Sequence, residues 1–161
     1  MQRFGLFPPA ESLDGFEPEY KLSDHTASGD AQITAVEILD AAGHARTEFN
    51  TGEDLRIKIH HSFSGVLHNG YLWAGIFRND DIYCHGVSRK LKEGVVVLHY
   101  PKLPLLTGDY YLSVGIWKKD QKEPLVYRHN ISNFKMNFGG QDHGTVYLEH
   151  AWKMQLPFRN D

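Results

Sequence analysis

The stretch YLSVGIWKKD, residues 111–120, decides the fold that the sequence predicts. It aligns without a gap to YLWAGIFRND, residues 71–80, and the two stretches share Tyr, Leu, Gly, Ile and Asp at matching places. In both copies the aliphatic residues fall on every second position, which is the period of a β-strand. The other positions hold aromatic rings on either side of a glycine. The chain therefore predicts two similar strands, each with large rings around a residue that has no side chain.

Period-two alternation recurs through most of the chain, and no long stretch keeps a helical period. Turn-forming residues separate the alternating runs, as at Gly43, Gly52 and Gly94. Many short strands in a chain with 15 glycines and 12% aromatic residues indicate an all-β fold, and we predict an antiparallel β-sandwich. The expected strands are residues 31–39, 55–63, 71–78, 82–88, 95–100, 110–118, 125–128, 131–138 and 145–154.

The start of the chain differs from this body. Residues 1–28 contain several prolines, acidic residues and no sustained period, so we interpret them as a linker or leader. The β-sandwich domain is predicted to cover residues 29–161. We expect the scattered aromatic residues of the leader to lie on a neighbouring surface; they are Phe4, Phe7, Phe16 and Tyr20.

Composition excludes several classes of partner. A net charge of -3 with both signs interspersed predicts no binding to nucleic acid, which requires a basic surface. Cys84 is the lone cysteine, so the chain forms no internal disulfide and fits a reducing compartment. No apolar run approaches the ~18 residues of a membrane span. We expect a cytoplasmic protein.

The glycine-containing faces of the repeated strands indicate a ligand site. Glycine weakens a strand, and one reason for its presence is that a ligand or another backbone approaches closely. Aromatic rings stack on the C–H faces of sugars, while imidazole, guanidinium, ammonium and hydroxyl groups bond to sugar oxygens. We expect the rings to point towards water over a glycine floor, beside the polar face of residues 55–63. The predicted carbohydrate-binding residues are Trp73, Tyr83, His85, Tyr111 and Trp117, with Arg56, Lys58, His60 and Ser113 as polar neighbours.

Other interpretations of the same residues stay open. Alternation does not say which face is buried, so the rings either form this platform or fill a two-layer core. A second class is a cupin-like metal-dependent sugar enzyme, which binds its ion in a cavity rich in histidine. The residues that would converge in it are His60, His85, His99 and Glu149. The third class is a protein-interaction sandwich without a ligand, which uses the leader and the C-terminal strand.

Motifs for catalysis are missing from the sequence. It contains no clustered HxH ligand pair, no GxSxG elbow and no HExxH helix motif. It also contains no GxxxxGK[ST] loop for a nucleoside triphosphate. We therefore expect no catalytic residues, no bound metal and no cofactor.

Several stretches resemble the C-terminal domain of Wzt, the ATPase subunit of bacterial ABC transporters that export O-antigen polysaccharide. The resemblance lies in an opening pair of strands, in a central hairpin and in a last strand, and it spans about residues 28–154. It includes no catalytic signature. The stretches are GDAQITAVEILD at 29–40, Gly43, FNTGEDL at 49–55, LPLLTGDY at 103–110, LSVGI at 112–116, GTVYL at 144–148, His150 and Trp152.

The resemblance implies an immunoglobulin-like β-sandwich that pairs as a homodimer by exchanging its C-terminal strand, with the segment 138–144 as the hinge. It implies a non-catalytic domain in the cytoplasm, peripheral to the inner membrane, that works with an ABC ATPase domain and a membrane permease. Its ligand would be the non-reducing terminus of an O-antigen polysaccharide, made in lipopolysaccharide biosynthesis. Its role would be to give the exporter its substrate specificity. The missing nucleotide-binding loop means that the resemblance does not extend to ATP binding.

Overall fold

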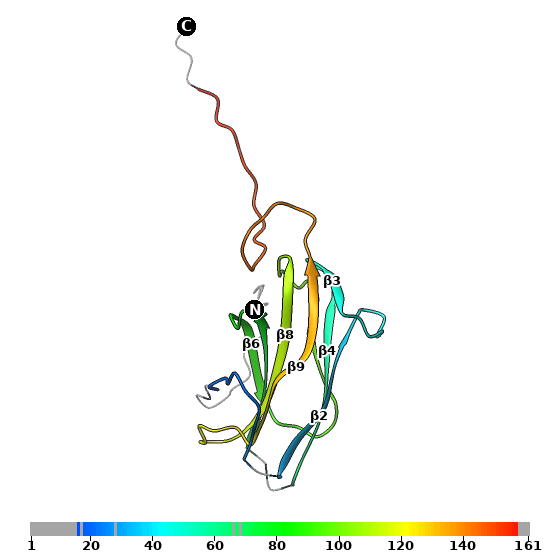
Figure 1. Ribbon diagram of the computed structural model, residues 1–161, viewed down its shortest axis with the longest axis vertical. Coiled ribbons are helices and arrows are strands. Elements are labelled where there is room, and N and C mark those ends of the chain that lie inside the picture. Colours follow the sequence, from blue (N-terminus) through cyan, green and yellow to red (C-terminus); the bar gives the residue numbers. More distant parts are fainter. Residues whose placement is uncertain (1–15, 17, 28, 66, 68, 158–161) are drawn as a thin grey trace, which may run out of the picture.

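The chain folds into two β-sheets that face each other (Figure 1). The computed structural model describes residues 16, 18–27, 29–65, 67 and 69–157. These residues form nine strands and no helix, so none of them belongs to a helix that could cross a membrane. The strands are β1 (His25–Thr26), β2 (Ala31–Leu39), β3 (Glu48–Asn50), β4 (Leu55–Phe63), β5 (Gly70–Arg78), β6 (Tyr83–Lys90), β7 (Val96–Tyr100), β8 (Gly108–Lys118) and β9 (Val126–Asn137).

The two sheets differ in size. Sheet A has the order β1-β9-β8-β5-β6, and β3 is added beside β9. Sheet B has the order β2-β4-β7. Among the described strands, every neighbouring pair is antiparallel except β3 and β9, which run parallel. The prediction of an all-β antiparallel sandwich is confirmed, with this parallel pair as a departure from it.

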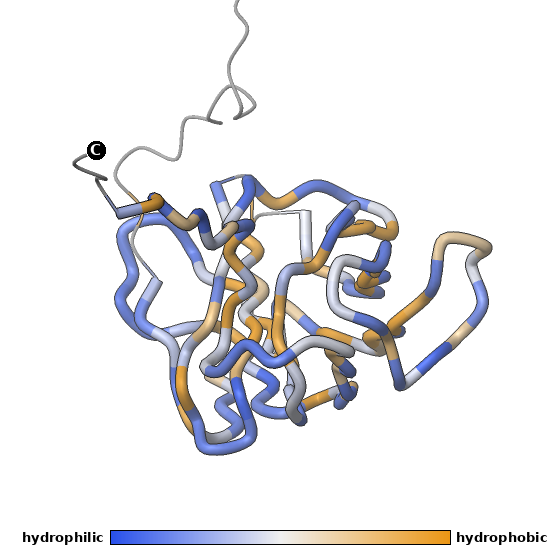
Figure 2. The backbone as a smooth tube through the Cα atoms, turned by 90° about the horizontal axis from the view of Figure 1, so that it is seen from above, coloured by the Kyte–Doolittle hydropathy of each residue, from blue (hydrophilic) through white to orange (hydrophobic). Residues whose placement is uncertain are grey.

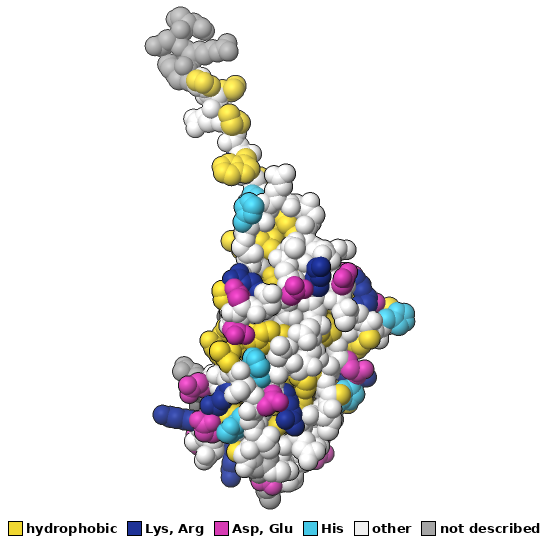
Figure 3. Space-filling model, in the orientation of Figure 1, with side chains coloured by type: hydrophobic (Ala, Val, Ile, Leu, Met, Phe, Trp, Pro, Cys, Tyr) yellow, Lys and Arg dark blue, Asp and Glu magenta, His cyan; other side chains and the backbone are white. Residues whose placement is uncertain are grey.

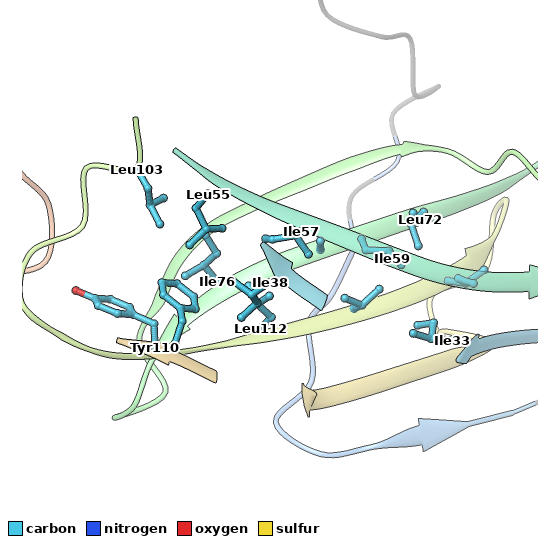
Figure 4. Close-up of a cluster of buried hydrophobic side chains, with 14 of the residues drawn as sticks. Ile33, Ile38, Leu55, Ile57, Ile59, Leu72, Ile76, Leu103, Tyr110 and Leu112 are labelled. Atoms are coloured by element: carbon cyan, nitrogen blue, oxygen red, sulfur yellow. The ribbon is translucent and has the colours of Figure 1, made fainter. Parts of the chain in front are cut away.

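The aliphatic faces of the strands form the core between the two sheets, as alternation predicts. In sheet B, Leu55, Ile57 and Ile59 of β4 are at most 1% exposed. In sheet A, Leu72 of β5 and Leu112 of β8 belong to the same buried cluster (Figure 4). Hydrophobic and hydrophilic residues alternate along the strands, and the turns are mostly hydrophilic (Figure 2). Burial of each such side chain contributes roughly 1.5–3 kcal/mol, so this layer holds the sheets together.

Strand boundaries agree best with the prediction where the alternation is uninterrupted. Strands β2 and β4 begin and end where they were predicted, at residues 31–39 and 55–63. The runs predicted at residues 125–128 and 131–138 are instead one long strand, β9. A strand that loses its alternation in the middle looks like two strands in the sequence.

A bulge in β9 causes that loss of alternation. Leu112 of β8 pairs with Ser132 of β9. Val114, two residues further along β8, pairs with Arg128, so three residues of β9 lie opposite Ser113 alone. Extra residues of this kind bend a strand and re-aim its side chains.

The strand predicted at residues 145–154 is wrong. An isolated antiparallel bridge joins Val146 to Leu105, and residues 148–157 continue as an exposed extended arm. This arm leaves the body of the molecule with its hydrophobic side chains open to solvent (Figure 3). The largest of them are Leu148, Trp152, Met154 and Leu156, between 72% and 95% exposed. The segment is extended but pairs with no strand among the described residues.

The predicted leader takes part in the fold where it is described. Strand β1 lies within it and pairs with the edge of β9. Asp24 accepts a hydrogen bond from the backbone N–H of His129 over 2.8 Å. These contacts fix the end of the leader to sheet A. Residues 1–15, with Phe4 and Phe7, lie outside the described residues, and the domain boundary stays a prediction.

Candidate functional site

The residues predicted to bind carbohydrate lie on both outer faces of the sandwich, so no single surface gathers all of them. The chain crosses from sheet B to sheet A between β4 and β5. Arg56, Lys58 and His60 therefore lie on the outer face of sheet B, opposite the buried face of β4. Trp73 and Trp117 lie on the outer face of sheet A. Alternation shows which residues share a face of one strand, but not which strands share a sheet.

A β-bulge separates Tyr83 from His85, although strict alternation along the predicted strand 82–88 places both on one face. Ile76 of β5 pairs with His85, and the next residue, Phe77, pairs with Tyr83, so one extra residue of β6 lies between them. Tyr83 follows Phe77 on the outer face of sheet A. His85 turns to the inner side, where its Nδ1 lies 2.9 Å from the hydroxyl oxygen of Tyr100 in sheet B. Partial burial lowers the pKa of His85 and favours the neutral ring. The expectation of a shared face is wrong.

The rings of the repeated strands are buried. Trp73 is 2% exposed, and Phe77 and Trp117 are 0% exposed. Together with Tyr111 and Tyr127 they form a hydrophobic cluster separate from the core between the sheets. We call these five residues the ring cluster. It lies on the outer face of sheet A, but the expectation of rings that point towards water is wrong.

The rings themselves fill the space above the glycines. A Cβ atom added at Gly75 would lie 2.4 Å from the Trp73 indole. A Cβ atom added at Gly115 would lie 2.5 Å from the Trp117 indole. Both distances are shorter than any contact a real Cβ atom makes, so each glycine is where a neighbouring ring approaches the backbone. The repeat therefore serves ring packing and leaves no open glycine floor for a ligand.

The N-terminal segment covers the ring cluster. Phe16 stacks on Tyr71, with ring centroids 4.2 Å apart and planes inclined by 10°. Tyr20 packs against Phe77 at 5.2 Å and against Tyr83 at 4.8 Å. Aromatic pairs of this kind contribute about 0.5–1.5 kcal/mol beyond the area that they bury. The expectation that these two leader residues lie on a neighbouring surface is confirmed, and their position explains how the rings are shielded from water.

On sheet B, the predicted polar neighbours Arg56 and His60 bond to carboxylates of their own face. His60 Nε2 lies 2.7 Å from Glu37 Oε2. Asp54 Oδ2 lies 2.6 Å from His99 Nε2, and Asp54 Oδ1 accepts a hydrogen bond from Arg56 Nε over 3.1 Å. The bond to His99, followed by the bond to Arg56, holds the pKa of Asp54 below its usual range. Arg56, His60 and His99 are thus each held by a carboxylate of the same face.

The residues considered for a cupin-like metal site do not converge. His60 and His99 lie on the outer face of sheet B, each beside its own carboxylate. His85 lies in sheet A, and Glu149 lies on the exposed arm. Within the described part of the chain, no group of three or more His, Cys, Asp or Glu side chains could hold a metal ion.

An open cavity occupies the other half of the outer face of sheet A. Its volume is about 480 Å³, and it lies where the start of β8 meets β9 and β3. The outer face of β8 joins the two halves, because it runs from Trp117 in the ring cluster through Tyr111 at the boundary to Asp109 in the cavity. We call this cavity the amide groove. Its polar lining residues include Asn79, Asp81, Asp109, Asn130, Asn133 and Lys135.

Two residues predicted from the sequence shape the amide groove from beneath. The Tyr111 hydroxyl donates a hydrogen bond to Asp81 Oδ1 over 2.7 Å. Burial, together with this bond, raises the pKa of Tyr111, so the phenol stays neutral. Ser113 is 0% exposed, and its Oγ accepts a hydrogen bond from the backbone N–H of Asn130 over 3.1 Å. Tyr111 and Ser113 thus position Asp81 and Asn130 at the groove.

Backbone strain is concentrated at the same groove. Asp81 and Asn130 have φ angles of 68° and 52°, in the left-handed region that side chains other than glycine rarely adopt. Asp120 is the third such residue among those described, and it does not line the groove. Strained residues persist where the surrounding structure holds them, and they gather at binding sites.

A larger cavity of about 770 Å³ adjoins the amide groove. Thr47, Glu48 and Asn133 line both cavities, so the second continues the first towards β2 at the edge of sheet B. Arg46 in its wall is held by Glu53, with Nη1 and Oε2 2.6 Å apart. The bond from Arg46, followed by the backbone N–H of Asn50, holds the pKa of Glu53 below its usual range.

The polar residues of the groove were not predicted from the sequence. Asn79 falls in a turn and Asn130 between two predicted strands, so neither continued an alternating run. Asp109 could have been predicted, because it lies two residues before Tyr111 and therefore shares its face of the strand. No pattern in one sequence brings Asn79 and Asn130 beside Asp109, since their proximity depends on strand pairing.

The sandwich and its open polar groove define an all-β domain with a surface suited to ligand binding. A family model described as the Wzt C-terminal domain matches residues 23–148. The chain belongs to this family. Among curated proteins, none matches the chain.

One solved structure of this family has the same fold. The crystal structure of the C-terminal domain of Wzt is 18% identical in sequence, with a TM-score of 0.65, and the match covers 90% of this chain and 100% of that one. At this identity the likeness shows the fold. A β-glucuronidase from Bifidobacterium dentium, solved in complex with coumarin-3-O-glucuronide, matches with 13% identity and a TM-score of 0.42 over 66% of this chain and 18% of the enzyme. That second match is too weak to carry an argument.

Proposed function

We propose that this domain recognises the non-reducing terminus of an O-antigen polysaccharide and gives an ABC exporter its substrate specificity. Membership in the Wzt C-terminal domain family carries the proposal, because it supports a carbohydrate-binding domain of an ABC transporter. In this proposal the domain performs no catalysis and works in the cytoplasm, at the inner membrane. Its partners are the ABC ATPase domain and the membrane permease of the exporter.

The amide groove supports saccharide binding. Amide and carboxylate groups donate to and accept from hydroxyls, and carbohydrates present many hydroxyls on an otherwise C–H surface. Of the residues predicted from the sequence, Tyr111 lines this groove. Contact with Trp117 requires that the N-terminal segment moves away first, because Phe16 packs against this buried ring. Trp73 is buried by rings of sheet A itself.

The test is a calorimetric titration of the protein with the polysaccharide of the producing organism, prepared with and without its natural terminal residue. We expect micromolar or weaker binding to the terminated polymer, because an open groove leaves much of a sugar hydrated. The unterminated polymer should bind at least tenfold more weakly. Equal binding to both polymers would contradict end recognition, and binding to neither would remove carbohydrate recognition altogether.

We also propose that the protein forms a homodimer through its C-terminal arm. The arm, residues 148–157, is extended and presents apolar side chains to solvent, as a strand does when its partner is another chain. The segment 138–144, which ends at Gly144 with φ 106°, would be the hinge.

Light scattering tests this dimer. The full chain should have the mass of a dimer, and a chain that ends at residue 147 should have the mass of a monomer. The control is Leu22→Ala, which removes an exposed apolar side chain from the N-terminal segment and leaves the arm complete. A truncated chain that still dimerises would contradict exchange of the arm.

A further inference from the structure

The lining of the amide groove carries more negative than positive groups. Glu48, Asp81 and Asp109 place three carboxylates around it, and Lys135 places one ammonium group. Arginine is absent from the described residues that line the groove. The forked guanidinium that binds phosphate and carboxylate groups by two parallel hydrogen bonds is therefore missing from its described wall.

The adjoining cavity does not reverse this balance. Arg46 and Glu37 both line it. Arg46 makes two hydrogen bonds to the carboxylate of Glu53, at 2.6 and 3.2 Å. A guanidinium engaged in this way has lost its best geometry for an incoming anion.

From this geometry we propose that the amide groove is the saccharide-binding site and that it selects an uncharged terminal sugar over one that bears a phosphate or a carboxylate. The inference rests on the proposed carbohydrate function and adds to it the place of binding and the chemical class of the ligand. A terminal anion would meet three carboxylates and one cation at close range, with a low-dielectric protein wall on one side.

The groove has the components that an uncharged sugar requires. Asn79, Asn130 and Asn133 each offer two N–H donors and one carbonyl acceptor, so they match hydroxyl groups, which both donate and accept. Tyr110 and Phe134 also line the groove, but their side chains are at most 3% exposed and belong to the core between the sheets. The surface that the groove offers to a sugar is therefore made mainly of amide and carboxylate groups, which match its hydroxyl groups.

The two other surfaces considered for sugar binding, the ring cluster and the outer face of sheet B, fit a sugar less well. The ring cluster is at most 3% exposed, so a sugar reaches it only after the N-terminal segment leaves. The outer face of sheet B has its histidines and Arg56 bonded to Glu37 and Asp54. The amide groove is open as it stands.

Matched asparagine variants on one strand test the location. Asn133 lines both cavities, and Asn137, four residues further along β9, is exposed and lines neither. The probes are trisaccharides of mannose, rhamnose, galactose and N-acetylglucosamine, measured by calorimetry and by the side-chain NH₂ signals in a ¹H–¹⁵N NMR spectrum. For each trisaccharide that binds, Asn133→Ala should weaken binding at least fivefold, and Asn137→Ala should change it less than twofold. The NH₂ signals of Asn79, Asn130 and Asn133 should shift, and that of Asn137 should not.

Charge removal tests the class of ligand. The same trisaccharides are prepared with a terminal phosphate or a terminal uronic acid, and we expect at least tenfold weaker binding to these forms. The double variant Glu48→Gln, Asp109→Asn should bind the phosphate-terminated form at least tenfold more tightly than wild type does. The ratio of its affinity for the phosphate-terminated form to its affinity for the uncharged form should rise at least tenfold over the same ratio in wild type. The control is Glu93→Gln, which removes an exposed carboxylate from a turn away from the groove.

The outcomes separate this inference from the proposed function. Binding of the uncharged probes that is equal in wild type and Asn133→Ala overturns the groove as the site, while carbohydrate recognition stands. Tighter binding of the phosphate or uronate form by wild type overturns the selection of uncharged sugars. Binding of neither the trisaccharides nor the natural polysaccharide overturns the proposed function and this inference together.

Discussion

The two halves of the outer face of sheet A have opposite relations to water, although the same strand runs through both. One half is the ring cluster, where Trp73 and Trp117 are closed over by their own neighbours and by Phe16. The other half is the amide groove, where Asp109 and Asn133 stay exposed. Large rings expose so much apolar area that a free face of rings is costly in water. The outer face of a strand is therefore either buried under other groups or open to solvent, depending on the size of its apolar side chains.

Trp117→Ala should have the largest effect on this comparison. Trp117 is 0% exposed, and its Nε1 donates a hydrogen bond to the Lys122 carbonyl oxygen over 3.1 Å. Removal of a buried indole leaves a cavity, and we expect a loss of about 3–5 kcal/mol in the free energy of unfolding. The measurement is urea unfolding followed by far-UV circular dichroism. Asn133→Ala in the groove half is the control, expected within about 0.5 kcal/mol of wild type; equal effects of the two variants would contradict the division into halves.

Gly115→Ala tests the close approach of rings to backbone. The added Cβ atom would lie 2.5 Å from the Trp117 ring and 2.9 Å from the Tyr127 ring. Both rings are fully buried and have little room to move, so we expect a loss of about 1–3 kcal/mol in the free energy of unfolding. At Gly139, by contrast, nothing lies within 4 Å of the added atom. Gly139→Ala is the control and should change the free energy of unfolding by less than about 0.5 kcal/mol. A Gly115→Ala protein as stable as this control would show that the rings do not pack closely against the backbone of Gly115.

Phe16→Ala tests whether the N-terminal segment seals the ring half. Phe16 is half-buried and stacks on Tyr71 at 4.2 Å, so we expect a loss of about 1–2 kcal/mol, below the range for a fully buried phenylalanine. Tryptophan emission should shift to longer wavelength, and acrylamide should quench it more strongly, because water then reaches Trp117. Leu22→Ala is the control in the same segment, since Leu22 is 52% exposed. Unchanged emission in the Phe16 variant would mean that another element provides the cover.

The sequence predicts each strand of this fold better than it predicts the neighbours of that strand. Alternation placed β2 and β4 at their observed bounds, and it assigned the aliphatic faces to the core, because face and period are local properties. It misplaced His85, since a one-residue bulge reverses every face beyond it. It left open whether Trp117 was covered, because Phe16, which packs against it, is far away in sequence. The amide groove is the least local feature, with lining residues from strands and turns that only the pairing of β8, β9 and β3 brings together.

Tyr111→Phe should have the smallest effect, and it probes the boundary between the two halves. Burial, with the bond to Asp81 as a second cause, raises the pKa of Tyr111 above the value of about 10 found in an unfolded chain. The neutral phenol therefore stabilises the folded state fully below pH ~10, and this contribution is lost as the pH rises through the folded pKa. At pH 7 the variant should lose about 1 kcal/mol in the free energy of unfolding, because the hydrogen bond to Asp81 is lost. Phenylalanine does not ionise, so the stability of the variant should fall less than that of wild type between pH 9 and 11, measured in about half-unit pH steps. Urea midpoints across this range measure both effects, with Tyr147→Phe, at the base of the exposed arm, as the control. Parallel pH profiles for wild type and Tyr111→Phe would mean that this phenol is not held neutral at the edge of the ring cluster.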